Sequence, residues 1–231
     1  MRPMEVNGHA APRNCQIVLF DLDGTLVDSA PDLGGAGNDL RRRLGLEDLP
    51  LEDYRPMTGA GARGMLGVAL GVLPEDPRFE SLKTEYLDLY AVRMTRDTRI
   101  FDGMGAVLNA LESAGRPWGV VTNKHSRFAL PVLQALDLLR RSAVTVCGDT
   151  AERAKPFPDP LLLAARRLGQ PPAACVYVGD DLRDVQAGRL AGMVTVAAAW
   201  GYLGAGEPID AWGADHRVED AGGLLKLLGL D

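Results

Sequence analysis

The stretch IVLFDLDGTLVDS, residues 17–29, opens with an apolar run of β-favouring residues and continues with two aspartates separated by one residue. Such uninterrupted hydrophobicity is typical of a strand that is buried on both faces of a sheet. Asp21 and Asp23 follow the run directly, and Gly24 permits a sharp turn of the backbone. The stretch therefore predicts a buried strand whose carboxyl end carries a pair of carboxylates.

Four similar apolar runs follow, at residues 118–121, 143–147, 175–179 and 193–198. Segments with helical periodicity separate them. This alternation predicts an α/β fold in which a doubly wound parallel sheet is connected by right-handed crossovers.

Residues 31–98 break this rhythm, because they contain no strand-like run and their apolar residues recur at helical spacing. We expect a helical insertion after the first strand. Open α/β sheets bind ligands beyond the carboxyl ends of their strands. An insertion at this point is therefore expected to cover the site as a lid.

The composition excludes several classes of function. The 231 residues carry a net charge of −6 and a pI of about 5.2, so no basic surface for nucleic acid or an anionic membrane is expected. No stretch approaches the roughly 18 apolar residues of a membrane span. Three cysteines without CxxC or Cys/His spacing predict neither a disulfide framework nor a zinc site. We expect a cytoplasmic monomer or homodimer that acts on a small molecule, with a flexible leader over residues 1–14, which lack the apolar core of a signal peptide.

Four polar elements each follow an apolar run, and the carboxyl ends of parallel strands meet at one edge of the sheet. These elements contain Asp21 with Asp23 to Thr25, Thr122 to Lys124, Lys155, and Asp180 with Asp181 and Asp184. Five carboxylates cannot share a pocket without compensation. Mg²⁺ is the expected compensation, because it prefers oxygen ligands and a substrate phosphate. The site fits phosphoryl transfer in which one carboxylate attacks phosphorus and its neighbour shuttles the proton.

In this order, DLDGT, Thr122, Lys155 and GDDLRD resemble the four motifs of the haloacid dehalogenase superfamily. The resemblance covers residues 15–230 and implies a Mg²⁺-dependent phosphatase. It also implies a Rossmann-like catalytic core over residues 15–29 and 99–231, with residues 30–98 as a helical cap of the C1 type.

Carried over to this sequence, the resemblance makes Asp21 the nucleophile and Asp23 the general acid and base. Thr122 is expected to hydrogen-bond the phosphoryl group, and Lys155 to neutralise nucleophile and phosphate. Asp180 is expected to ligate Mg²⁺ together with Asp21 and the backbone carbonyl of Asp23.

Several further residues have less specific expectations. Asp184 is expected to act on the metal indirectly, by contacting its ligands or through a water, and Asp181 either tunes the metal or caps the following helix. Asn123 is expected to bind substrate, and His125 either lines the pocket or begins a helix in solvent. Loop or capping roles are expected for Asp28 and Asp32. Trp200 and Tyr202 either pack in the core, which is the favoured role, or flank the mouth of the site.

The substrate implied first is that of the phosphoglycolate phosphatase group. WGVVTNK, GDDLRD and AWGAD also resemble the branch that dephosphorylates N-acetylmuramic acid 6-phosphate. Both esters carry a carboxylate, for which Arg63 in the insertion is the candidate reader, with an exposed helix-start arginine as the alternative. The surrounding GAGARG spells G-x-G-x-x-G but follows no predicted strand, so a dinucleotide site is not expected.

Three other functions use a similar set of residues: a phosphomutase, a receiver-type signalling module and a dehalogenase. A phosphomutase would share the four motifs, and a receiver-type signalling module also combines aspartates, a threonine and a lysine. A receiver carries its acidic pair at the first strand and its lysine at the last, whereas here Asp180 and Asp181 follow Lys155. A dehalogenase needs no proton shuttle at Asp23 and is disfavoured.

Overall fold

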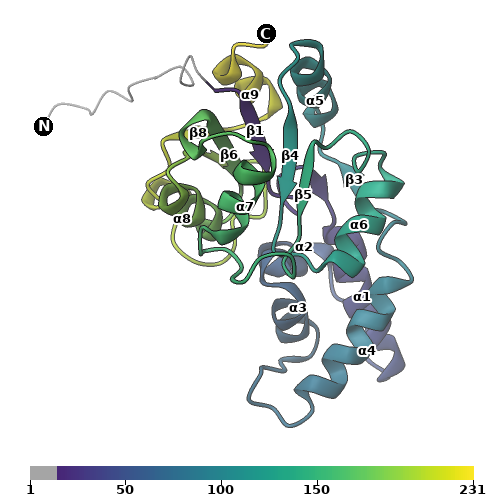
Figure 1. Cartoon of the computed structure of the whole chain (residues 1–231). Helices are drawn as coiled ribbons and strands as arrows, with labels where there is room; N and C mark the ends of the chain where they lie inside the picture. The colour runs from purple at the N-terminus through teal and green to yellow at the C-terminus, as the bar shows by residue number, and fades with distance from the viewer. Residues whose placement is uncertain (1–14) are drawn as a thin grey trace, which may run out of the picture.

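The computed structural model describes residues 15–231, so the leader expected over residues 1–14 lies outside the described residues. Six parallel strands form the main sheet in the order β5-β4-β1-β6-β7-β8 (Figure 1). They are β1 (Ile17–Phe20), β4 (Trp118–Val121), β5 (Val144–Val146), β6 (Cys175–Gly179), β7 (Val194–Ala198) and β8 (His216–Val218). The five apolar runs are thus confirmed as strands of a parallel sheet.

The edge strand β8 was not predicted from the sequence. It is only three residues long, and its first two residues are polar and at least partly exposed. A short strand at the edge of a sheet needs no apolar run, because one side of it faces solvent.

Strand β1 lies at the centre of the sheet, where Val18 pairs with Trp118 of β4 and with Val176 of β6. The chain builds β4 and β5 on one side of β1 and then β6, β7 and β8 on the other. Such a reversal of strand order opens a crevice at the carboxyl ends of the central strands, where α/β proteins bind ligands.

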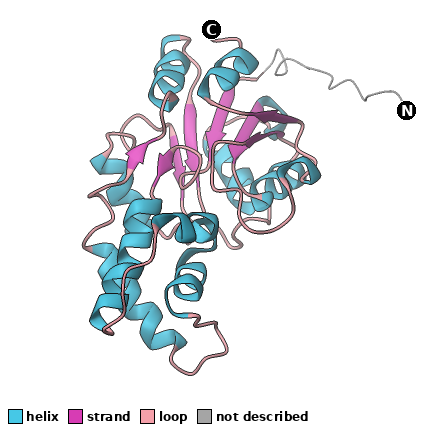
Figure 2. Ribbon diagram, turned by 180° about the vertical axis from the view of Figure 1, so that it is seen from behind, coloured by secondary structure: helices cyan, strands magenta, loops and turns pink. Residues whose placement is uncertain are grey.

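Side chains of β1 alternate between two apolar layers, as the pleat of a strand requires. Val18 and Phe20 pack in one cluster with α5 (Met104–Ser113), α6 (Ser126–Ala135) and α9 (Ala221–Leu228). Ile17 and Leu19 pack in the other cluster with α7 (Asp159–Arg167) and α8 (Leu182–Ala191). The helices therefore cover both faces of the sheet, as Figure 2 shows from behind.

A second, smaller sheet joins the two ends of the helical insertion. Strands β2 (Val27–Asp28) and β3 (Arg99–Ile100) pair antiparallel. The elements between them are α1 (Ala30–Arg43), α2 (Leu51–Tyr54), the 3₁₀ helix η1 (Arg55–Ala60), α3 (Gly61–Leu70) and α4 (Phe79–Ala91). We call these five elements the helical lobe. The two remaining 3₁₀ turns are η2 (Pro172–Ala174) and η3 (Ile209–Ala211).

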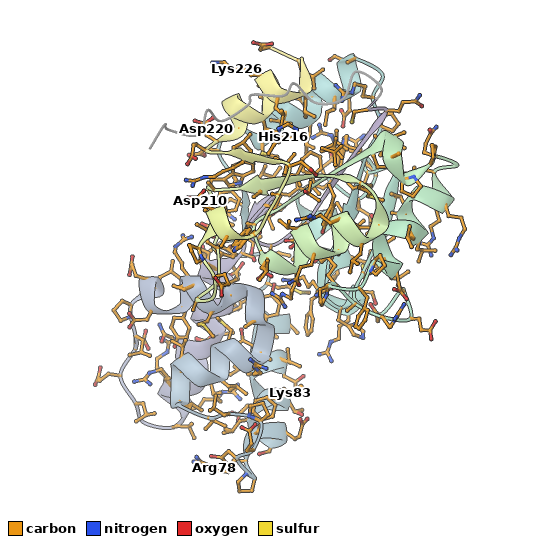
Figure 3. The ribbon with its side chains drawn as sticks, turned by 90° about the vertical axis from the view of Figure 1, so that its left-hand side faces the viewer. Arg78, Lys83, Asp210, His216, Asp220 and Lys226 are labelled. Atoms are coloured by element: carbon orange, nitrogen blue, oxygen red, sulfur yellow. The ribbon has the colours of Figure 1, made fainter. Side chains whose placement is uncertain are left out.

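The helical lobe has a separate apolar cluster, in which Leu40, Tyr54, Met65 and Tyr86 are fully buried and to which α6 of the core contributes Phe128. It lies beyond the carboxyl ends of the strands, with Arg78 and Lys83 near its far end (Figures 1 and 3). The position matches the expected lid, whereas its division from the core as a domain over residues 30–98 stays a prediction. Among residues 15–231, no helix combines the length and the apolar character needed to cross a membrane.

Candidate active site

The loop after β1 turns back sharply and brings its aspartates to the edge of the sheet. The amide of Asp21 donates to the carbonyl of Val178, so the pairing of β1 with β6 extends to this residue. Gly24 has φ of +86°, and a Cβ there would lie 2.1 Å from Oδ2 of Asp180. Only glycine satisfies both the positive φ and this close approach.

Three carboxylates gather at the ends of β1 and β6. Asp21, Asp180 and Asp184 each offer an oxygen, and the three oxygens lie within 4.8 Å of one another. Burial raises the pKa of Asp21 to about 7, although the ammonium of Lys155 acts in the opposite direction. Burial and then the charges of Asp21 and Asp184 raise the pKa of Asp180 well above its usual range. The cluster therefore has an excess of negative charge that a cation would relieve.

Lys155 compensates part of this charge. Its Nζ lies 2.9 Å from Oδ1 of Asp21 and 2.7 Å from Oδ1 of Asp184. It also donates to the hydroxyl of Tyr177 and to the carbonyl of Val121. Burial lowers the pKa of Lys155, but the two carboxylates more than offset this effect, so its pKa is raised. The lysine is thus a buried ammonium held from four sides.

Tyr177 was not predicted as part of the site. Its hydroxyl donates to the carbonyl of Val121 at 2.8 Å and lies 3.1 Å from Oδ1 of Asp184. It sits inside the apolar run of β6, where a sequence pattern gives a tyrosine no distinct signal.

Asp180 is oriented by two neighbouring segments. The Thr25 hydroxyl donates to Oδ1 at 2.7 Å, and the amide of Tyr202 donates to Oδ2 at 2.8 Å. A Cβ on Gly201 would lie 2.2 Å from the Cβ of Asp180, so the loop after β7 can approach this closely only because residue 201 is glycine. The carboxylate is therefore fixed in direction by both flanking loops.

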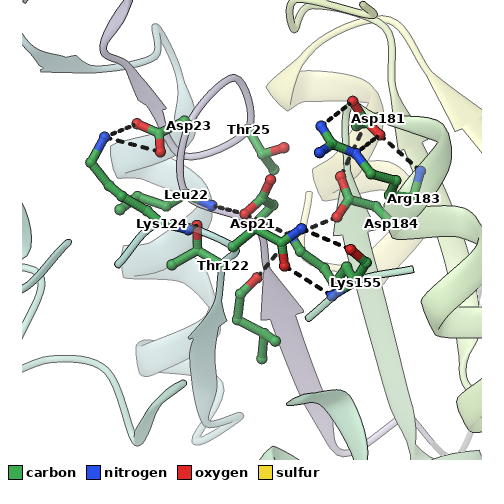
Figure 4. A network of polar contacts seen from close by, with 12 residues as sticks. Asp21, Leu22, Asp23, Thr25, Thr122, Lys124, Lys155, Asp181, Arg183 and Asp184 are labelled. Carbon is green, nitrogen blue, oxygen red and sulfur yellow. Dashed lines mark hydrogen bonds and ion pairs between the residues drawn. The ribbon is translucent and has the colours of Figure 1, made fainter. Parts of the chain in front are cut away.

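Asp23 points away from the acidic cluster and toward the ammonium of Lys124 (Figure 4). Its Oδ1 accepts hydrogen bonds from the Ser29 hydroxyl at 2.5 Å and from Nζ of Lys124 at 2.8 Å. Lys124 in turn lies 4.8 Å from the ring centroid of Tyr90 in α4. Burial lowers the pKa of Lys124, but Asp23 and Tyr90 raise it to a value above the usual range.

The loop after β4 contributes two of the predicted residues. Thr122 is buried, and its hydroxyl accepts a hydrogen bond from the amide of Lys124. The side-chain amide of Asn123 donates to the carbonyl of Lys155 and accepts from its amide, both at 2.9 Å. Asn123, expected to bind substrate, thus holds the main chain of Lys155 at the wall of the site.

Asp181 has the capping role, one of the two that were expected for it, and its influence on the metal stays a prediction. Its Oδ1 accepts from the amide of Arg183, while Oδ2 of Asp184 accepts from the amide of Asp181, which completes a capping box at the start of α8. His125 caps α6 in a similar way, since its Nδ1 accepts from the amide of Arg127, and it also lines the pocket.

The capping prediction for Asp32 is wrong, and Asp28 has a larger role than a loop residue. Asp32 is fully buried in the first turn of α1, where Oδ2 accepts from the amide and the hydroxyl of Thr98. Asp28 forms a bidentate ion pair with Arg55 of the helical lobe. Ser29 occupies the N-cap position instead. Asp32 therefore joins α1 to a distant segment, and Asp28, whose Oδ1 also accepts from the amide of Ala30 at 3.4 Å, joins the start of α1 to Arg55.

Tyr202 does more than pack in the core. Its hydroxyl accepts from the amides of Ser29 and Ala30 at 2.8 and 2.9 Å and donates to Oδ1 of Asp28. It thereby accepts from two backbone donors at the start of α1, of which the Ala30 amide also reaches Oδ1 of Asp28 at 3.4 Å. Trp200 donates from Nε1 to the carbonyl of Thr25. Both aromatic residues therefore fix the loop that carries the acidic residues.

A cavity of about 440 Å³ lies between the strand ends and the helical lobe. Its floor contains all the predicted catalytic and acidic residues, and the lobe contributes Leu33, Thr58, Gly59, Tyr86 and Tyr90. Of the residues that the structure describes, Arg63 is not among those that line this cavity. It is exposed and lines a neighbouring cavity, because the first turn of α3 directs it there. Arg127 and Arg183 bring guanidinium groups to the wall of the site; Arg183 lies within GDDLRD, but neither arginine was expected to have a role there.

Known proteins with similar sequences belong to the family whose motifs form this site. The family model of the haloacid dehalogenase-like hydrolases matches residues 15–192. The N-acetylmuramic acid 6-phosphate phosphatase of Pseudomonas aeruginosa is 42% identical over 211 residues, which cover 91% of this chain and 93% of that protein. The phosphoglycolate phosphatase of Xanthomonas campestris pv. campestris is 46% identical over 203 residues, which cover 87% of this chain and 91% of that protein.

A solved structure has the same fold. The crystal structure of a predicted phosphoglycolate phosphatase from Haemophilus somnus superposes with a TM-score of 0.81 at 26% identity. The superposition covers 93% of this chain and 98% of that one. Together with the geometry of the acidic cluster, these matches identify the chain as a member of the haloacid dehalogenase-like hydrolases.

Proposed function

We propose that this protein is a Mg²⁺-dependent phosphatase that hydrolyses a small phosphate monoester through a phosphorylated Asp21. The observation that carries the proposal is the position of Asp21, at the floor of the cavity and paired with Lys155. The carboxylates of Asp180 and Asp184 lie close enough to Asp21 to hold one metal ion together with it. The relatives named above, which carry the names of phosphatases, support the same reaction.

The donor set fits a hard divalent cation. Asp21 and Asp180 would hold Mg²⁺ with the backbone carbonyl of Asp23, as in the family pattern. Asp184 suits an indirect contact through water, because Oδ1 already accepts from Lys155 and Oδ2 from the amide of Asp181. When bound, Mg²⁺ supplies positive charge that draws nucleophile and phosphate together and stabilises the phosphoryl oxygens.

The first half of the reaction is a displacement at phosphorus. A carboxylate oxygen of Asp21 forms a bond to phosphorus while the ester P–O bond breaks. Asp23 donates a proton to the leaving oxygen, which departs as an alcohol. Lys155 and Thr122 offset the negative charge on the phosphoryl oxygens.

The second half regenerates the enzyme. Water attacks the phosphorus of the phosphorylated Asp21, and Asp23 accepts the proton that this water loses. The bond between phosphorus and the Asp21 oxygen breaks, and phosphate leaves. For both proton transfers Asp23 has to turn from Lys124 toward the cavity, so its pairing with Lys124 describes a resting arrangement.

2-Phosphoglycolate is the first candidate substrate. The family resemblance supports it, and so do the relatives from Xanthomonas and Xylella that are named phosphoglycolate phosphatase. N-acetylmuramic acid 6-phosphate is the second candidate, and the cavity favours it. A volume of about 440 Å³ with walls from Leu33, Tyr86 and Tyr90 is large for a two-carbon acid. A cytoplasmic location and a monomeric or dimeric state stay predictions.

Turnover of the two esters side by side, with Mg²⁺ and with a chelator, tests the proposal. We expect phosphate release from at least one ester that depends on the metal. Mass spectrometry after rapid quenching is expected to find the phosphoryl group on Asp21. An isomerised sugar phosphate without free phosphate would indicate a mutase instead, and a label on another residue would exclude the mechanism.

A further inference from the structure

Two cavities lie side by side between the core and the helical lobe. The first is the candidate active site, and the second has a volume of about 550 Å³. Four residues line both cavities: Gly59, Ala60, Asp181 and Arg183. These residues therefore form the partition between the two spaces.

The guanidinium of Arg183 holds this partition closed. Its Nη2 donates to the backbone carbonyl of Gly59, in η1 of the helical lobe, at 2.6 Å. Its Nε and Nη2 also donate to the two carboxylate oxygens of Asp181 at 2.7 and 2.8 Å. Asp181 cannot follow a moving arginine, because it caps α8. The arginine thus joins a fixed point of the core to the backbone of the lobe.

The lobe approaches the core closely at this point. A Cβ on Gly59 would lie 3.3 Å from Oδ2 of Asp181 and 3.4 Å from Nη2 of Arg183. The hydrogen bond between Arg183 and the Gly59 carbonyl is charge-assisted, and such bonds are the stronger ones in proteins. The pKa of Arg183 is raised, chiefly by its bond to Asp181 and against the effect of burial, so the guanidinium keeps its charge.

Beyond the partition, the second cavity has an apolar wall and a positive charge, which suit part of a bulky anionic ester. Its wall combines apolar side chains, among them Met57, Leu203 and Trp212, with the exposed guanidinium of Arg63. With Arg183 in place, this space is separated from the acidic cluster.

We propose that Arg183 is a specificity-determining residue, which limits the size of the ester that the site accepts by closing the partition between the two cavities. The proposal rests on the proposed phosphatase function and concerns the same site. Removal of the side chain joins the cavities, and an ester with a large alcohol portion gains room that a compact ester does not need.

The test compares three variants. Arg183→Ala opens the partition, and Arg183→Lys keeps a charged donor that can reach the Gly59 carbonyl. Arg189→Ala is the matched control, because Arg189 lies in the same helix and also donates to a glycine carbonyl, that of Gly213, at 2.9 Å. Among the described residues that line the two cavities, Arg189 is not included.

The measured quantity is the ratio of kcat/KM for N-acetylmuramic acid 6-phosphate to kcat/KM for 2-phosphoglycolate. We expect Arg183→Ala to raise this ratio by about tenfold, which is the usual size of a pocket-contact effect on discrimination. Arg183→Lys is expected to lie between Arg183→Ala and wild type, and Arg189→Ala to match wild type. An unchanged or lowered ratio for Arg183→Ala overturns the proposal.

Amide hydrogen exchange tests the role of Arg183 without relying on phosphatase activity. Loss of the bond to Gly59 is expected to accelerate exchange over residues 58–62 in Arg183→Ala but not in Arg189→Ala. If the wild-type protein hydrolyses neither ester, the proposed function fails. The exchange then decides by itself whether Arg183 holds the partition, and equal rates in all variants overturn that role.

Discussion

Two lysines with largely buried side chains flank the candidate active site, and they differ in the groups that hold them. Within residues 15–231, the ammonium of Lys155 contacts groups of the core: Asp21 directly after β1, and residues of β4, β6 and α8. Lys124 pairs with Asp23 of the core and lies over the ring of Tyr90 in the helical lobe. The first ammonium is therefore part of a rigid sheet edge, whereas the position of the second depends on where the lobe lies.

The difference separates two tasks of the site. Groups around Lys155 hold the attacking carboxylate of Asp21 in a fixed place. Such positioning lowers the activation barrier of the reaction. Groups around Lys124 hold Asp23, which has to change partners during the proposed reaction. Substitutions on the two sides should thus differ in their effects on stability and on turnover.

The largest expected effect is that of Asp21→Asn on turnover. The variant removes the nucleophile on the Lys155 side, so we expect kcat/KM to fall by at least about 10⁴-fold. Thermal unfolding should be preserved or improved, because an uncharged amide relieves repulsion among the three clustered carboxylates. Activity close to that of wild type would exclude the assigned role.

Substitution of each lysine by methionine compares the two sides directly. Lys155→Met leaves Asp21 and Asp184 without their buried partner, and we expect a loss of about 3–5 kcal/mol in the free energy of unfolding. Lys124→Met leaves only Asp23, whose side chain is 15% exposed, and we expect a loss of about 1–2 kcal/mol.

Urea unfolding at pH 7 with a chelator present measures both losses. Equal losses for the two variants would contradict the distinction between a rigid and a lobe-dependent lysine. Lys83→Met is a suitable control, because Lys83 pairs with Glu80 at the surface of α4, where little effect is expected.

Stability of the metal-free protein should depend on pH through Asp21. The pKa of Asp21 is about 7 in the folded protein and about 3.8 in the unfolded chain, so between these values the folded state binds a proton that the unfolded state has lost. The free energy of unfolding therefore falls as pH rises from about 4 to 7. The contribution is on the order of 4 kcal/mol, at about 1.4 kcal/mol for each pKa unit.

The matched measurement is the same pH series on Asp21→Asn, which lacks this group. We expect the wild-type protein to lose stability relative to the variant over this range, and Mg²⁺ to reduce the difference. Parallel curves for the two proteins would show that the Asp21 carboxyl is ionised throughout.

The sequence predicted the Lys155 side better than the Lys124 side, for a physical reason. Asp21, Lys155 and Asp180 follow apolar strands, and the ends of parallel strands meet wherever the sheet forms. Lys124 was placed at a strand end too, but its contact with Tyr90 depends on how the helical lobe packs onto the core. Helical periodicity indicates which face of α4 is buried, but it does not indicate which residues pack against that face.

The same limit explains the remaining corrections. Arg63 lies in the insertion and its guanidinium suits a carboxylate, yet the turn of α3 directs it into the neighbouring cavity. Asp28 and Asp32 lie at positions where capping is common, but each contacts a segment more than 25 residues away, Arg55 and Thr98 respectively. Contacts of this range leave no local pattern in the sequence.

The smallest effect that we predict concerns the junction between the two regions. Tyr202→Phe keeps the ring and the amide bond to Asp180 but leaves the amide of Ser29 without its acceptor and the amide of Ala30 with only the longer contact to Asp28. We expect a loss of about 1–2 kcal/mol in stability and faster hydrogen exchange at the start of α1. Tyr177→Phe is the matched variant on the Lys155 side, and it should leave exchange at α1 unchanged. If Tyr177→Phe accelerates that exchange as much as Tyr202→Phe does, the core and the lobe respond as one unit and the contrast between the two lysines does not hold.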